Sequence, residues 1–67
     1  MTSKEACIYD LRHKIAFMEM EKTEFINTQN KRKVKMSEAT YEWMINNYDA
    51  VILYLTILME NYKNKIT

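Results

Sequence analysis

The sequence contains no glycine and no proline, and it has one cysteine and one histidine. Tight β-turns depend on glycine and proline, so their absence argues against a fold rich in β-strands. Cys7 has no second cysteine with which to form a disulfide, and Cys7 with His13 falls short of the ligand set of a structural zinc site. We therefore expect an all-α chain that holds no disulfide, metal or cofactor.

The chain is also short, at 67 residues. A domain of this size buries about 60% of the surface that its unfolded form exposes, so its stability is marginal. Small domains usually gain stability from disulfides, metals or association, and only association remains here. We expect a single domain that pairs with itself or with another protein.

No segment of the sequence is typical of a targeting signal or a membrane span. The opening stretch "MTSKEACIYDLRHK" mixes apolar and charged residues, unlike a signal peptide. The most apolar stretch, "DAVILYLTILME", is shorter than the about 20 apolar residues that cross a bilayer. We expect no membrane partner and a cytoplasmic location, in the cell or in an infected host cell, which also suits an unpaired thiol.

The first half of the chain predicts a helix over residues 3–27. Thr2 and Glu5 have the spacing of a capping box, which marks a helix start. Apolar residues then recur at the a and d positions of a heptad, with Lys22 interrupting at an a position. They are Ile8, Leu11, Ile15, Met18 and Phe25. Phe17 and Met20 lie away from this stripe, either as scattered surface residues or as part of a contact surface.

The second half predicts a helix over residues 37–62, after a polar, basic connection over 28–36. Ser37 is a good N-cap, and Glu38 places negative charge on the first turn, where the helix dipole favours it. One apolar stripe fills every a and d position: Tyr41, Met44, Tyr48, Val51, Leu55, Leu58 and Tyr62. This stripe can face the first helix in an antiparallel hairpin.

Two further apolar stripes exceed what one partner helix can cover. Ile45, Ile52 and Met59 form the second stripe, and Trp43, Ala50 and Ile57 form the third. A helix that is apolar over most of its circumference is buried on several sides. We therefore predict that the hairpin dimerises into a four-helix bundle, or docks on another protein. The predicted protein interface comprises Phe17, Met20, Trp43, Ile45, Ile52, Ile57 and Met59.

Positive charge is concentrated in the connection. Residues 1–36 carry eight basic and five acidic side chains, a net charge of +3, whereas residues 37–67 carry two basic and four acidic ones, a net charge of −2. The connection includes Lys31, Arg32, Lys33 and Lys35. These residues are either a solvated loop or a contact for nucleic acid or an acidic partner. The overall charge of +1 is low for a dedicated DNA-binding protein.

The residue types that carry out catalysis occur without the partners they need. His13 has no nucleophile or carboxylate set around it in the sequence, and Cys7 has no paired base. Glu19 and Glu21 point in different directions on a helix, and the Glu-x-x-His pair of carboxylate-bridged metal sites is missing. We expect no catalytic residues, no metal site and no small-molecule substrate.

Two short pieces of the chain resemble the small helical-hairpin phosphatases that act on aspartyl-phosphate in sporulation control. The pieces are Leu11-Arg12 and Ile45-Asn46-Asn47-Tyr48. The family's Ser-Gln-x-Leu-Asp motif is replaced by "EATYE", with Glu42 in place of the key aspartate. The resemblance implies a two-helix hairpin, and it would place Glu42 at the position of that aspartate.

These observations favour a small, non-enzymatic binding protein that regulates by protein–protein interaction. The abundance of Lys, Asn, Ile, Met and Tyr is typical of an AT-rich genome, so a phage or mobile-element inhibitor of a host protein would fit. Two alternatives stay open. One is a nucleic-acid-binding regulator that uses a dimeric helical bundle and the basic connection. The other is an aspartyl-phosphate phosphatase-like hairpin.

Overall fold

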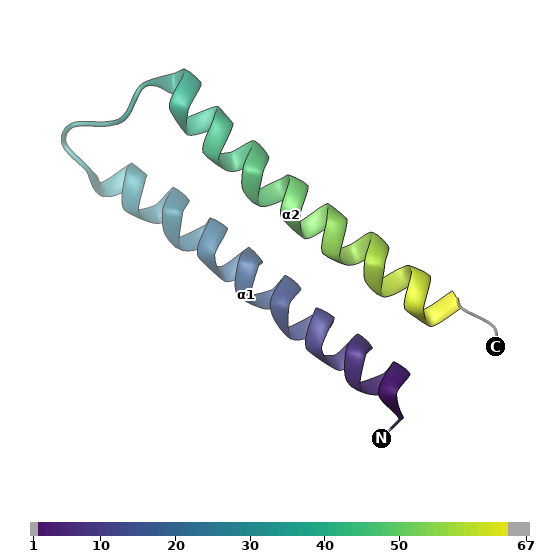
Figure 1. Ribbon diagram of the computed structural model, residues 1–67. Helices are drawn as coiled ribbons and strands as arrows, with labels where there is room; N and C mark the ends of the chain where they lie inside the picture. The colour runs from purple at the N-terminus through teal and green to yellow at the C-terminus, as the bar shows by residue number, and fades with distance from the viewer. Residues whose placement is uncertain (1, 65–67) are drawn as a thin grey trace.

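A computed structural model shows two long helices that run antiparallel and are joined by one connection (Figure 1). The structure describes residues 2–64, with α1 at Ser3–Lys31 and α2 at Glu38–Asn64. The start of α1 and the end of α2 lie together at one end of the hairpin, and the connection lies at the other. The predicted all-α hairpin is confirmed. The dimer and the four-helix bundle stay predictions.

Both predicted helix starts are confirmed, together with their caps. The backbone N–H of Glu5 donates to the Thr2 hydroxyl oxygen at 3.1 Å, and that hydroxyl donates to the Glu5 carboxylate at 3.2 Å. At α2 the backbone N–H of Thr40 donates to the Ser37 hydroxyl oxygen at 3.2 Å. Each cap satisfies one of the N–H groups that a helix start leaves without a partner inside the helix.

The predicted end of the first helix at residue 27 is wrong, because α1 continues to Lys31. The a positions of the heptad, at Ile8, Ile15 and Lys22, continue to Gln29, which is only 6% exposed. The last turn is thus helical although its sequence, "TQNK", is polar. The connection is therefore shorter than predicted and begins at Arg32, where the backbone N–H donates to the Gln29 carbonyl at 3.3 Å.

The two helices meet along a seam, defined here by the residues that recur on their facing sides. On α1 the seam includes Leu11, which is 7% exposed, and Phe25, whose ring lies 5.6 Å from Tyr41 and 5.8 Å from Tyr48, measured between centroids. Lys22 interrupts the seam as predicted, and its ammonium pairs with the Asp49 carboxylate at 2.6 Å. A charged group at such a position helps to fix the register of two helices.

The α2 side of the seam differs from the predicted stripe. Val51 is 41% exposed, whereas Ile45, Ile52 and Met59 are partly buried within the chain. The seam on α2 is therefore centred on Tyr41, Ile45, Tyr48, Ile52, Leu55, Met59 and Tyr62, and Met44 and Leu58 of the predicted stripe are partly buried at its border. From Tyr41 onward, the observed seam residues are spaced four and then three residues apart in turn. The predicted stripe also starts at Tyr41, but its spacing is three and then four residues. Both paths are apolar, so composition alone did not distinguish them.

Burial along the seam is thin. Among residues 2–64, Leu11 is the only buried apolar side chain, and it still keeps 7% of its surface exposed. The chain is 53 Å long and 20 Å wide but only 10 Å thick, so it is a single layer of helices. Domains are usually built from at least two packed layers. Within the described range, no helix is long and apolar enough to cross a bilayer.

Candidate functional site

The side of α2 opposite the seam is apolar and exposed. At 3.6 residues per turn, Trp43, Ala50 and Ile57 recur on this side every two turns. We call these three residues the outer edge of α2. Trp43 is 62% exposed and Ile57 is 51% exposed. Both residues were predicted to belong to an interface, and the structure leaves both uncovered.

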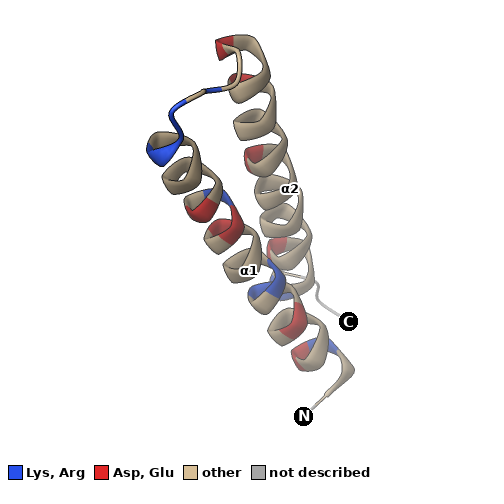
Figure 2. Cartoon of the chain, turned by 90° about the vertical axis from the view of Figure 1, so that its left-hand side faces the viewer, with Lys and Arg blue, Asp and Glu red and all other residues tan. Residues whose placement is uncertain are grey.

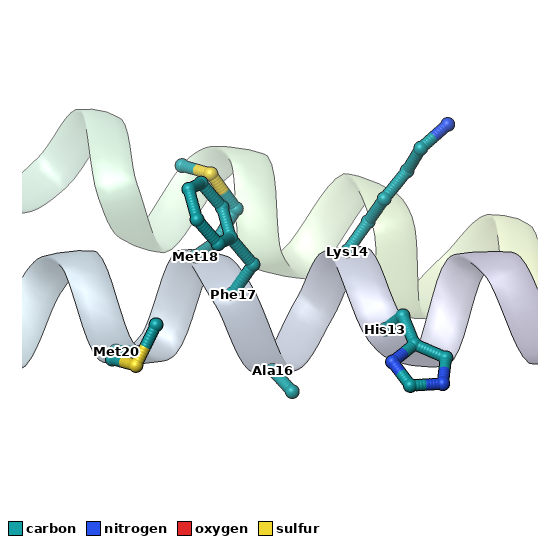
Figure 3. Close-up of a pocket in the computed structure, with 6 residues that line it drawn as sticks. All are labelled: His13, Lys14, Ala16, Phe17, Met18 and Met20. Atoms are coloured by element: carbon teal, nitrogen blue, oxygen red, sulfur yellow. The ribbon is translucent and has the colours of Figure 1, made fainter.

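Phe17 and Met20, the predicted interface residues of α1, are also exposed, at 54% and 53%. They border a shallow hollow that is formed entirely by α1 and is lined by His13, Lys14, Ala16, Phe17, Met18 and Met20. In Figure 3, Lys14, Phe17 and Met18 point to one side of the helix, whereas His13, Ala16 and Met20 point to the other. Such side chains enclose no cavity, so the hollow suits the surface of another macromolecule rather than a small molecule.

The structure divides the seven predicted interface residues into two groups. Phe17, Met20, Trp43 and Ile57 are exposed, and the other three, Ile45, Ile52 and Met59, are partly buried as part of the seam. Sequence reasoning missed Leu53 and Tyr54, which are 60% and 65% exposed. The sequence did contain a signal for both residues. They are large and apolar, and they lie outside the three predicted stripes.

The two flanks of α2, between the seam and the outer edge, differ in charge. All the charged residues of this helix lie on one side, which we call the charged flank: Glu38, Glu42, Asp49, Glu60 and Lys63. Two ion pairs support this placement, since Asp49 reaches Lys22 and the Lys63 ammonium lies 3.6 Å from the Glu60 carboxylate. In Figure 2, α2 is accordingly mostly tan with separate red bands, whereas α1 carries both colours along its length.

The opposite flank of α2 has no charged residue. It contains Met44, Val51 and Leu58, which recur every two turns, with Asn47 and Tyr54 beside them. We call Met44, Val51 and Leu58 the apolar flank. Met44 and Leu58 are partly buried, and Val51 is exposed. An apolar strip therefore passes from the seam over this flank to the outer edge without meeting a charge.

The basic residues lie at the closed end of the hairpin. Lys31 ends α1, and Arg32, Lys33 and Lys35 belong to the connection. All four are exposed, and between them Val34 is 84% exposed. The connection is visible in Figure 2 as the blue segment that leaves α1. These charges therefore form a separate surface, at the end of the molecule, from the apolar residues along the helices.

The residues considered for catalysis are not brought together into a cluster. The His13 ring packs on the Tyr9 ring with centroids 4.3 Å apart, and Cys7 is partly buried. Arg12, in one of the two pieces that resemble the phosphatases, and Glu42, at the position of that family's aspartate, are both exposed. Over residues 2–64, no group of three or more His, Cys, Asp or Glu side chains is close enough to hold a metal ion.

Comparison with known proteins adds no relative. No protein-family model, curated protein or solved structure matches this chain significantly.

Proposed function

We propose that this chain is a non-enzymatic binding protein that regulates another protein through its exposed apolar surface. The observation that carries the proposal is the exposure of Trp43, Ile57 and Phe17 on the sides of the helices that face away from the seam. Leaving a large apolar side chain in water forgoes about 1.5–3 kcal/mol of burial free energy. Several such residues on one small chain are typical of a contact surface.

The types of residue on this surface also support the proposal. Aromatic residues and methionine are enriched in protein interfaces, and tryptophan is frequent among the residues that dominate binding energy. The exposed residues of these types are Trp43 and Tyr54 on α2 and Phe17 and Met20 on α1. These residues lie on helices rather than on loops, so each helix presents its side chains in a fixed arrangement.

Trp43→Glu tests this proposal. We expect the variant to capture at least tenfold less of the partner protein, because a charge would have to be desolvated where an indole ring was buried. The tagged chain is immobilised, exposed to lysate of the cell that carries its gene, and the bound proteins are quantified by mass spectrometry. Asn47→Glu, one turn further along α2, adds the same charge without removing an apolar side chain. Capture that survives both Trp43→Glu and Phe17→Glu would contradict the proposal.

The exposed basic residues favour a second candidate, a regulator that binds nucleic acid through the closed end of the hairpin. The same capture assay distinguishes the two functions. Changing Lys31, Arg32, Lys33 and Lys35 together to Ser leaves protein capture intact if the apolar surface is the site. If the basic residues contact phosphates, this variant instead weakens RNA or DNA binding at low salt and flattens the dependence of binding on salt.

The proposal extends to the kind of protein that this chain regulates. The abundance of Lys, Asn, Ile, Met and Tyr is typical of an AT-rich genome. It supports an inhibitor that is carried by a phage or another mobile element and is directed at a host protein in the cytoplasm. A phosphatase-like hairpin is the least supported alternative, because "EATYE" stands where that family has its diagnostic motif. Loss of phosphate from a response regulator's aspartyl-phosphate on addition of the chain would favour it.

A further inference from the structure

The hairpin exposes more surface than a folded protein of its mass normally does. A monomer of 8.1 kDa exposes about 4,500 Å² by the usual scaling of surface with mass, and this chain exposes 5425 Å². This excess area is similar to the area of about 800 Å² that each partner contributes to a standard interface. The broad face of the layer, 53 Å by 20 Å, is large enough to provide that area.

The apolar flank of α2 is symmetric about the middle of the helix. Val51 is the central residue of Glu38–Asn64, and Met44 and Leu58 lie two turns before and two turns after it. A two-fold axis that passes through Val51 at right angles to the helix would therefore place Met44 of one copy opposite Leu58 of the other. An isologous interface requires this self-complementary arrangement.

Charge also favours a second copy on this flank over the other side of the helix. Two apolar flanks can meet without burying a charge, because neither contains one. Two charged flanks would bring Glu42, Asp49 and Glu60 of both copies together, and juxtaposed like charges are costly when an interface desolvates them.

We infer that a second copy of this chain docks on the apolar flank, with the two α2 helices packed antiparallel about a two-fold axis at Val51. The dimer supplies the second layer that the hairpin lacks, and it covers Met44, Val51 and Leu58. It leaves Trp43 and Ile57 on the outer edge for a different partner. This inference deepens the proposed function, since it assigns one exposed surface to self-association and reserves the other for binding.

A matched pair of variants tests the inference on the purified chain, without any other partner. Val51 and Leu53 are both exposed, at 41% and 60%, and a step of two residues turns the helix by roughly 200°, so they lie on opposite flanks. We expect light scattering coupled to size exclusion to give twice 8.1 kDa for the unmodified chain and for Leu53→Lys. Val51→Lys should raise the dissociation constant at least tenfold and give the mass of one chain.

Cross-linking provides a second measurement that does not depend on the folding of Val51→Lys. In a Cys7→Ser background, Val51→Cys should form a covalent dimer when a mild thiol oxidant is added, and Leu53→Cys should not. A monomeric unmodified chain would overturn the inference, as would equal masses for the two lysine variants or equal cross-linking at the two cysteine positions. None of these outcomes bears on Trp43, whose role is measured by partner capture.

Discussion

Leu11→Ala is expected to lower the free energy of unfolding by about 2–4 kcal/mol, as at other buried leucines. Leu11 is 7% exposed and is the only buried apolar residue in the part of the chain that the structure describes. A protein of 67 residues has a total stability of roughly 3–10 kcal/mol, so this one change removes a large share of it. Urea unfolding followed by circular dichroism at fixed protein concentration measures the effect.

Leu53→Ala is the matched control for this prediction. Leu53 is 60% exposed, so shortening it removes few contacts within the hairpin. We expect a change within about 0.5 kcal/mol, which is usual for surface substitutions. If the two leucine variants lost the same stability, Leu11 would not be a buried residue of the seam.

Phe25→Ala should be nearly as damaging, with a loss of about 2–3 kcal/mol. The Phe25 ring contacts both Tyr41 and Tyr48, and it joins the last turns of α1 to the first turns of α2. Removing it leaves a gap between the two tyrosine rings and abolishes two aromatic contacts. The free energy of unfolding from urea titration measures the loss.

Phe17→Ala gives the comparison for Phe25, since these are the two phenylalanines of the chain and both lie on α1. Phe17 is 54% exposed, so its truncation should cost less than about 1 kcal/mol in folding. A loss as large as that of Phe25→Ala would mean that Phe17 packs inside the fold and is not part of the contact surface.

Local signals in the sequence predicted the start of each helix correctly. Thr2 with Glu5, and Ser37 before Glu38, depend on side chains within one turn of the cap, so no knowledge of the rest of the fold was needed. The heptad of α1 was equally clear, because a single apolar stripe with one polar interruption at Lys22 allows only one face to pack.

The sequence was less informative where more than one packing satisfies the pattern. On α2 both Val51 and Ile52 are apolar, and the choice between them depends on the rotation of the helix against α1, which the wide apolar face of α2 leaves open. The end of α1 was missed for a different reason. Gln29 is polar, and only its burial against the other helix shows that it continues the heptad.

The candidate site could be predicted in part. Trp43 and Ile57 fall on the third apolar stripe, which no hairpin seam can reach, so their exposure followed from periodicity alone. The difference between the two flanks of α2 required the seam to be placed first. Once Ile45, Ile52 and Met59 belong to the seam, the uncharged strip through Met44, Val51 and Leu58 lies at its border, with Met44 and Leu58 partly buried and Val51 exposed.

The dependence of thermal stability on protein concentration tests most directly whether association completes this fold. If two hairpins fold together, raising the concentration of the unmodified chain about a hundredfold, from about 1 to about 100 µM, should stabilise it by about 2.7 kcal/mol. For two 67-residue chains this corresponds to a rise in Tm of about 10 °C, measured by circular dichroism. A Tm that stays constant over this range would contradict the account, because the single hairpin would then be stable without a second layer.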